Sequence, residues 1–275
     1  MTYQEPLSQK TVAIAISESA DMGALGLAPE HLRDAMAEIA RHLLAMGARL
    51  VYGGDLRANG FTELLFELVA RHRRDADVGD ARPAVINYLA WPIVTSKPSA
   101  ELRGLADELA GLAELHFLDQ QGADLPPVTL DDTPGRVVTD ADWAEALTAM
   151  RAVLTRVSDA RVVLGGRTEG YKGRMPGIAE EALTALEASQ PLYLLGGFGG
   201  CARDIAVEMA LLPGPRIGAA WAERQAFQKF NEASLRNGLT AVENATLAKT
   251  VHVDEAVALI LRGLLRLAKS VAGTA

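Results

Sequence analysis

The strongest constraint on the fold is an alternation along the chain between short apolar runs and longer segments with helical periodicity. The apolar runs are too short for helices and almost unbroken, which is typical of strands buried on both faces of a parallel sheet. Polar residues or glycines bound each run. Six runs are expected to form strands, at residues 11–17, 48–52, 83–89, 113–118, 161–164 and 191–195.

The segments between these runs place apolar residues at helical spacing. Pro29 suits the first turn of one of them, and Gly47 suits its end. Strands that alternate with helices predict an α/β fold, a Rossmann-like open parallel sheet with helices on both faces. Helices are expected at residues 29–46, 61–72, 100–112, 141–157, 178–188, 202–212 and 255–271.

The sequence shows no clear linker, so we expect one domain over residues 11–275 after an N-terminal tail at residues 1–10. Residues 120–136 are rich in Pro, Gly and Asp and are the longest expected loop; a domain boundary there is the alternative. With 275 residues, 49% of them hydrophobic, the chain is long enough to bury a sizeable core.

Charge and composition exclude several classes of protein. The net charge of −8 disfavours nucleic acid as a partner, because such binding needs a basic face. No apolar run is long enough for a membrane helix. The single cysteine, Cys201, and the absence of an apolar leader favour the cytoplasm. The scattered histidines give no metal motif, so no metal is expected.

Three of the expected strands run into glycine pairs. In open α/β sheets, ligands bind beyond the carboxyl ends of the strands, and glycine there lets backbone N–H groups approach a phosphate. Tight turns that need glycine are the alternative interpretation, but three pairs together favour a ligand cleft. The pairs are Gly53–Gly54, Gly165–Gly166 and Gly196–Gly197, and Ser17 ends the first strand with a hydroxyl that could meet phosphate or cap a loop.

The second glycine pair opens a basic loop, GGRTEGYKG. It differs from a P-loop, because its lysine does not follow the glycine directly and no Ser or Thr comes after it. With Arg174, which follows it directly, the loop has three cations within eight residues, which predict anion recognition, with a solvated surface loop as the alternative. The candidate ligand-binding residues here are Arg167, Lys172, Gly173, Arg174 and Gly177.

Two carboxylates follow this loop at the start of a helix. Glu180 and Glu181 are candidates for binding ribose hydroxyls or for a catalytic carboxylate, or they simply complement the helix dipole. Asp204 is ambiguous in the same way.

The third glycine segment contains a G-x-G-x-x-A match. It lacks the following acidic residue that a dinucleotide fold uses for ribose, so a dinucleotide redox enzyme is a minor alternative and no cofactor is expected. Cys201 is interpreted as a packing residue. The candidate ligand-binding residues are Gly196, Gly197, Phe198, Gly199, Gly200 and Arg203.

Together these segments resemble the SLOG superfamily, which includes the cytokinin-activating LOG phosphoribohydrolases and nucleotide-sensor domains of bacterial antiphage systems. The resemblance rests on residues 165–181 and 191–203, and more weakly on residues 50–54 with 59–62. The likeness is strongest to the TIR- and PNP-associating branch. It implies a pocket for a nucleotide-derived small molecule such as ADP-ribose or a cyclic isomer.

In that branch the domain is joined to an NAD-consuming enzyme, so for this chain the resemblance implies a stand-alone sensor or a partner of a separate effector protein. The alternative is a LOG-like nucleotide N-glycoside hydrolase or a nucleoside deoxyribosyltransferase. Glu180 falls where the catalytic Glu of LOG enzymes would lie, but the preceding PGGxGT pattern is missing.

The resemblance also implies a homo-oligomer. The helices expected at 141–157 and 255–271 carry enough apolar residues to lie partly between subunits. The alternative is that both helices only cover the sheet of their own subunit.

Overall fold

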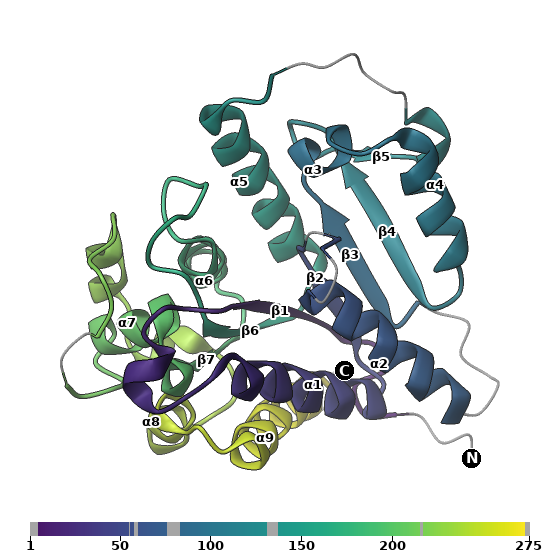
Figure 1. Ribbon diagram of the computed structural model, residues 1–275. Coiled ribbons are helices and arrows are strands. Elements are labelled where there is room, and N and C mark those ends of the chain that lie inside the picture. The colour runs from purple at the N-terminus through teal and green to yellow at the C-terminus, as the bar shows by residue number, and fades with distance from the viewer. Residues whose placement is uncertain are drawn as a thin grey trace.

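The computed structural model describes residues 5–54, 56–57, 60–75, 83–130, 137–214 and 217–272. Its centre is a seven-stranded sheet with the strand order β5-β4-β3-β2-β1-β6-β7 (Figure 1). All neighbours are parallel except β4 and β5. The strands are β1 (Thr11–Ser17), β2 (Arg49–Tyr52), β3 (Val85–Leu89), β4 (Ala113–Leu118), β5 (Asp124–Leu125), β6 (Ala160–Gly165) and β7 (Leu192–Leu195).

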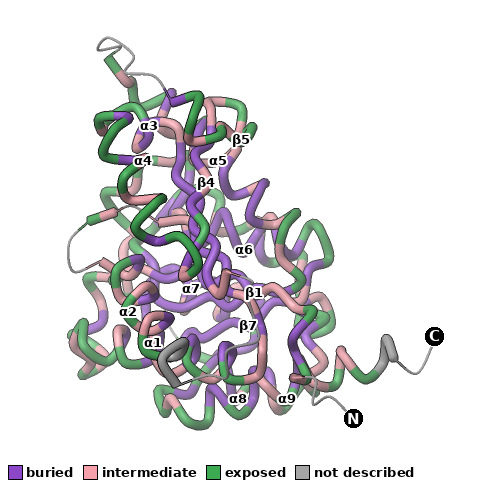
Figure 2. The backbone as a smooth tube through the Cα atoms, turned by 90° about the vertical axis from the view of Figure 1, so that its right-hand side faces the viewer, coloured by how far each residue is buried: buried purple, intermediate pink, exposed green. Residues whose placement is uncertain are grey.

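Helices cover both faces of this sheet, so the predicted Rossmann-like α/β fold is confirmed. One face carries α1 (Pro29–Ala45), α2 (Phe61–Asp75), α4 (Ser99–Glu108) and α9 (Val253–Ala272), with α8 (Ala241–Lys249) beside β7. The opposite face carries α3 (Trp91–Thr95), α5 (Asp140–Val157), α6 (Gly177–Glu187) and α7 (Gly200–Glu208). Figure 2 shows the buried strands running between the more exposed helices.

The strand β1 shows how the apolar runs specify two layers. Val12, Ile14 and Ile16 pack against the face that carries α1, while Ala13 and Ala15 face the other layer. Successive side chains of a strand point to opposite faces, so a run buried on both sides must be apolar at every position. The small alanines let the helices of the second layer pack closely on the centre of the sheet.

The chain order of the strands creates a switch point between β1 and β6. From β1 the chain adds β2, β3 and β4 outward in one direction, then returns to place β6 and β7 on the other side of β1. Ser17 and Gly165 are paired at the ends of β1 and β6, and the Gly166 N–H donates to the Ser17 carbonyl at 2.7 Å. Crevices at such points are the usual ligand sites of open α/β sheets.

Differences from the predicted elements lie in short connections. The expected loop at 120–136 contains β5 and the 3₁₀ helix η2 (Pro127–Thr129), and its residues 131–136 lie outside the described residues, as does Asn59. The helix α3 and the 3₁₀ helices η1 (Met22–Leu25), η3 (Gly196–Phe198), η4 (Arg224–Lys229) and η5 (Glu232–Leu235) were not predicted, because short turns have no periodicity to detect.

The expected N-terminal tail is only partly described, since residues 1–4 lie outside the described part. From Glu5 onward the segment forms turns against the body: Leu7 is fully buried and its N–H donates to the Met46 carbonyl at 2.9 Å. None of the described helices has the length and continuous apolar character needed to cross a bilayer.

The third glycine segment packs against other parts of the backbone. A Cβ at Gly197 would lie 2.1 Å from the Thr250 carbonyl oxygen that follows α8. Gly200 has a φ of +65°, and its Cβ would lie 2.3 Å from the Gly166 carbonyl oxygen. These glycines therefore let β7, α7 and the switch point approach closely.

The close approach at Gly197 predicts a large loss of stability on adding one methyl group. We expect Gly197→Ala to lower the free energy of unfolding by about 1–3 kcal/mol, because backbone rather than a flexible side chain must move. Urea denaturation followed by circular dichroism measures it. Gly23→Ala is the matched control, because a Cβ at Gly23 meets nothing within 4 Å. Equal stability of the two variants would contradict the packing role.

Candidate functional site

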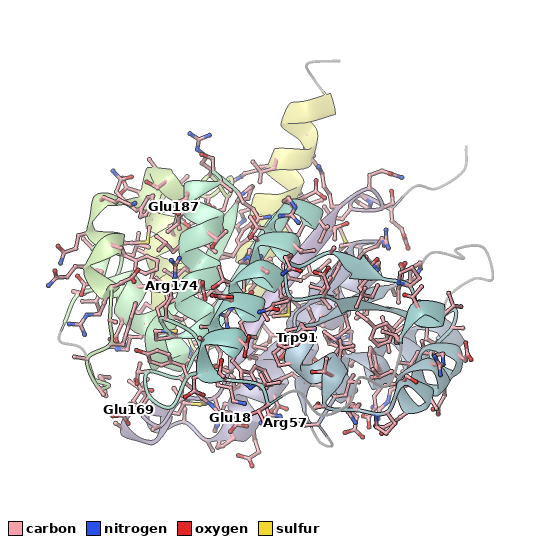
Figure 3. The ribbon with its side chains drawn as sticks, turned by 90° about the horizontal axis from the view of Figure 1, so that it is seen from above. Glu18, Arg57, Trp91, Glu169, Arg174 and Glu187 are labelled. Atoms are coloured by element: carbon pink, nitrogen blue, oxygen red, sulfur yellow. The ribbon has the colours of Figure 1, made fainter. Side chains whose placement is uncertain are left out.

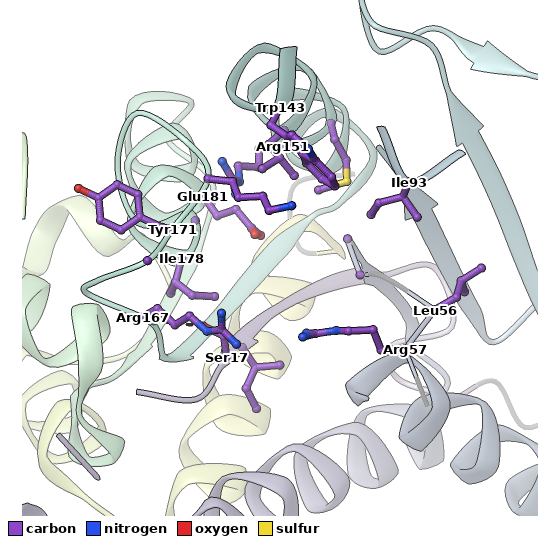
Figure 4. Close-up of a pocket in the computed structure, with 18 of the residues that line it drawn as sticks. Ser17, Leu56, Arg57, Ile93, Trp143, Arg151, Arg167, Tyr171, Ile178 and Glu181 are labelled. Atoms are coloured by element: carbon purple, nitrogen blue, oxygen red, sulfur yellow. Dashed lines mark hydrogen bonds between the residues drawn. The ribbon is translucent and has the colours of Figure 1, made fainter. Parts of the chain in front are cut away.

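A cavity of about 730 Å³ opens at the carboxyl edge of the sheet, beside the switch point (Figure 4). Ile16 and Ser17 reach it from the end of β1, and Gly53 and Gly54 from the end of β2. Its other walls come from α3, α5, the β6–α6 loop and the first turns of α6. The described lining residues on these walls include Ile93, Ser96, Trp143, Leu147, Met150, Gly170, Tyr171 and Ile178.

The charges around this cavity are mostly positive, although the whole chain is acidic. Among the described lining residues, one carboxylate, Glu181, faces a set of basic side chains. Clefts lined by one sign of charge concentrate ligands of the opposite sign. The basic lining residues are Arg57, Lys97, Arg151, Arg167 and Lys172.

Several residues singled out from the sequence come together here. The first glycine pair and the basic loop both contribute to the walls, although they lie far apart in the sequence. The predicted residues that line the cavity are Ser17, Gly53, Gly54, Arg167, Lys172 and Gly177. Their ligand-binding role stays a prediction.

The glycine pair after β6 sets the path of the basic loop. Gly165 and Gly166 both have positive φ, and Gly166 is hydrogen-bonded to the Ser17 carbonyl. The Arg167 N–H then donates to the Ser17 Oγ at 3.3 Å. Ser17 therefore fixes the point at which the loop leaves the sheet, with the Arg167 side chain on the cavity.

Lys172 is held in the cavity by an aromatic ring. Its Nζ lies 3.6 Å from the centroid of the Trp143 ring on α5, a cation–π contact. This contact joins the tip of the basic loop to a helix. Trp143 was not predicted from the sequence, where an isolated aromatic residue on a helix looks like a core residue.

Glu180 does not line the cavity and is 1% exposed. Its carboxylate accepts hydrogen bonds from the Arg151 guanidinium and the Thr148 hydroxyl, both on α5. The Arg174 Nε lies 3.5 Å from the same carboxylate on the exposed side. Figure 3 labels Arg174, which lies in the loop before α6.

The buried ion pair between Arg151 and Glu180 explains two of the predicted glycines. A Cβ at Gly177 would lie 2.6 Å from Arg151 Nη2, and one at Gly173 would lie 3.1 Å from Arg151 Nη1. Glycine at both positions therefore makes room for the Arg151 guanidinium.

Glu181 lies on the cavity wall but is also paired. Arg161, on β6 and fully buried, donates to its carboxylate and, at 3.2 Å, to the Thr155 Oγ1. Burial raises the pKa of Glu181, and the positive charge of Arg161 opposes that rise. Burial likewise lowers the pKa of Arg161, against the attraction of Glu181. The arginine was missed because the sequence pattern shows only an apolar strand.

The third glycine segment does not line this cavity. The Gly200 N–H at the start of α7 donates to both carboxylate oxygens of Asp21 at 3.0 Å, so a carboxylate of the chain occupies that helix N-terminus. Phe198 and Cys201 are fully buried, and burial raises the pKa of the Cys201 thiol. The predicted residues outside the cavity lining are Gly165, Gly166, Gly173, Arg174, Glu180, Gly196, Gly197, Phe198, Gly199, Gly200 and Arg203.

Asp204, which was ambiguous from the sequence, is 1% exposed and accepts a hydrogen bond from Trp221 Nε1 at 2.8 Å. In the described part of the chain, no group of three or more His, Cys, Asp or Glu side chains is placed to hold a metal ion.

Comparison with models of protein families gives a match over most of the chain. The family model described as SLOG cluster2 matches residues 6–259, which include every element from β1 to α8 and the beginning of α9. No curated protein matches the chain.

Arg151 and Arg174 both contact the carboxylate of Glu180, but we expect their removal to cost very different amounts of stability. Arg151→Ala should lower the free energy of unfolding by about 3–5 kcal/mol, because it leaves a buried carboxylate without its main partner. Arg174→Ala, at a side chain 59% exposed, should cost less than about 1 kcal/mol. Chemical denaturation of both variants measures the difference, and similar losses would contradict it.

Proposed function

The chain belongs to the SLOG cluster2 family, and we propose that it binds a phosphorylated, nucleotide-derived ligand in the cavity at the switch point without converting it. Membership of the SLOG superfamily implies a nucleotide-related binding domain. The identity of the ligand and the lack of turnover are our proposal.

The observation that carries the proposal is the basic cavity at the switch point. In a chain with a net charge of −8, basic side chains from four separate regions line one space. Two of them are already paired, Arg151 with Glu180 and Lys97 with Glu101. Arginine and lysine there can make charge-assisted hydrogen bonds to phosphate oxygens. The N-terminal turn of α6 also borders the cavity through Gly177 and Ile178, which adds a partial positive charge.

The size and the apolar walls of the cavity suit the rest of a nucleotide. A volume of about 730 Å³ falls within the range of about 300–1,000 Å³ for small-molecule sites. Ile93, Leu147 and Met150 offer apolar surface on the side of α3 and α5. A base or ribose lying on this surface would place its phosphate toward the basic side chains.

The position of Glu180 favours binding over N-glycoside hydrolysis or deoxyribosyl transfer. Its carboxylate is buried against Arg151 and Thr148 and is absent from the cavity wall. A catalytic carboxylate must come within hydrogen-bond reach of the reacting group. Among the described residues of the cavity wall, Glu181 is the one carboxylate, and Arg161 already binds it.

The finer points of the proposal come from the family resemblance. The ligand would be similar to ADP-ribose or a cyclic isomer, as in the TIR- and PNP-associating branch. A separate effector protein would read out binding in an antiphage or stress response.

A homo-oligomer also stays a proposal. α5 packs on the sheet through Met150 and Leu154, and α9 packs on α1. These contacts fit the alternative in which both helices cover their own subunit, so light scattering at micromolar concentration is the direct test.

Lys172 provides the test of ligand binding. If its ammonium group contacts a phosphate, Lys172→Ala should weaken binding by roughly ten- to a hundredfold, as expected for one charge-assisted contact. Calorimetric titration with ADP-ribose, cyclic ADP-ribose and AMP measures this. Lys229→Ala is the control, because that lysine is 58% exposed and lies outside the cavity lining.

A base-release assay with the same nucleotides separates the two functions. A binding protein leaves each nucleotide intact, whereas the enzymatic alternative releases free base. If the nucleotides stay intact and Lys172→Ala binds them with full affinity, the basic loop does not contact the ligand. Release of base by the unmodified protein would replace the proposed function with the alternative.

A further inference from the structure

A second cavity lies on the other side of the short helix α3 from the cavity at the switch point. It has a volume of about 590 Å³ and is enclosed by α3, the start of α4 and the segment from β5 to η2. Figure 1 shows α3 between α5 and α4. Trp91, Val94 and Thr95 of α3 line the second cavity, whereas Ile93 lines the first. The helix α3 therefore separates the two spaces.

The two cavities meet where α3 ends. Ser96 and Lys97, which follow this helix, line both of them. The Lys97 ammonium pairs with the carboxylate of Glu101 on α4, and these side chains are 30% and 52% exposed. A solvent-exposed pair of this kind contributes little stability, so exchanging its partner costs little. Lys97 is thus placed to meet a negative charge on a molecule that extends from one cavity into the other.

The second cavity differs from the first in its chemistry. Among its described lining residues, Lys97 is the one charged side chain, whereas five basic side chains line the first. Trp91, which is labelled in Figure 3, contributes an aromatic ring, and Val94, Leu102 and Leu130 contribute apolar surface. A space of this size with aromatic and apolar walls suits a neutral ring system better than a phosphate.

The hydroxyl groups of the second cavity favour a ligand that donates hydrogen bonds. Thr95, Ser96 and Thr129 each donate the hydroxyl hydrogen to a backbone carbonyl, at 3.2, 2.8 and 2.8 Å. What each oxygen can still offer is therefore an acceptor. Ribose hydroxyls and the amino groups of bases can donate to such oxygens, whereas an ionised phosphate has no hydrogen to donate.

From this arrangement we propose that the second cavity holds the second nucleoside of a dinucleotide whose first nucleotide occupies the cavity at the switch point. The inference rests on the proposed function, because it extends the same ligand past α3. The second base would lie against Trp91, and its ribose would lie near the hydroxyl groups. The phosphates that join the two halves would pass Ser96 and Lys97. An open dinucleotide can reach both cavities, whereas a mononucleotide fills only the first.

Diadenosine diphosphate and ADP are the matched probes for this second site. Both contain adenosine and two phosphates, but the first ends in a second adenosine and carries less negative charge. Calorimetric titration of the full chain should show diadenosine diphosphate binding at least about tenfold more tightly than ADP, as expected for one stacked base. Attraction to the basic side chains of the first cavity would give the opposite order, so charge does not account for this preference.

Two substitutions in the second cavity should abolish the preference and leave ADP binding unchanged. Thr129→Trp fills the space from an exposed position, and Trp91→Leu removes the aromatic ring; neither residue belongs to the described lining of the first cavity. Val128→Trp is the control, because it adds the same side chain to the same 3₁₀ helix at a position that is 84% exposed and outside the described lining. Circular dichroism and thermal unfolding check that each variant is folded.

The outcomes separate this inference from the proposed function. Equal binding of ADP and diadenosine diphosphate, or a preference that persists in both cavity variants, would overturn the second-nucleoside site and leave the proposed function standing. Two molecules of AMP bound per chain, one of them lost in Thr129→Trp, would make the second cavity a separate site and would also overturn it. If none of AMP, ADP, ADP-ribose and diadenosine diphosphate binds the unmodified protein, the proposed function fails and the inference fails with it.

Discussion

The pairing of β1 with β6 is the interaction on which the rest of the structure depends. This pairing joins the strands β2 to β5 on one side of β1 to the strands β6 and β7 on the other. Ser17 and Gly165 are paired where the two strands end. The connections after these two strands leave toward opposite sides, so the space between them is not filled by a crossover helix. The cavity lies around this pair of strand ends, with the basic loop on one side and Arg57 on the other.

Two buried Arg–Glu pairs hold the second layer of helices next to that point. Arg151 links α5 to Glu180, and Arg161 links β6 to Glu181. Removing such charges from water is costly, and a buried pair contributes little net stability compared with apolar residues of the same shape. Removing one partner is costly, however, because it leaves the other charge buried and unpaired. The pairs therefore fix how α5 and α6 sit relative to β6. This arrangement positions Trp143 under Lys172 and keeps Glu180 away from the ligand space.

The predicted glycines have different structural roles: some line the cavity, some turn the chain and some allow close packing. Gly53 and Gly54 border the cavity, and Gly165 and Gly166 turn the chain with positive φ beside β1. Gly173 and Gly177 make room for a guanidinium, while Gly197 lets β7 approach the end of α8. Their common place after strands therefore reflects close packing at a crowded sheet edge as much as contact with a ligand.

The sequence by itself determined the elements of the sheet, because burial on both faces requires unbroken apolar strands and amphipathic helices. Six of the seven strands were predicted to within about two residues, whereas β5 was expected to be loop; the basic loop was expected to contact a ligand and does line the cavity. Tertiary structure alone decided the partners of the charged residues. It placed Arg57 opposite Arg167, gave Glu180 to Arg151 and put Asp21 at the start of α7. These contacts join residues far apart in the chain, and local periodicity carries no information about which distant side chain will meet a charge.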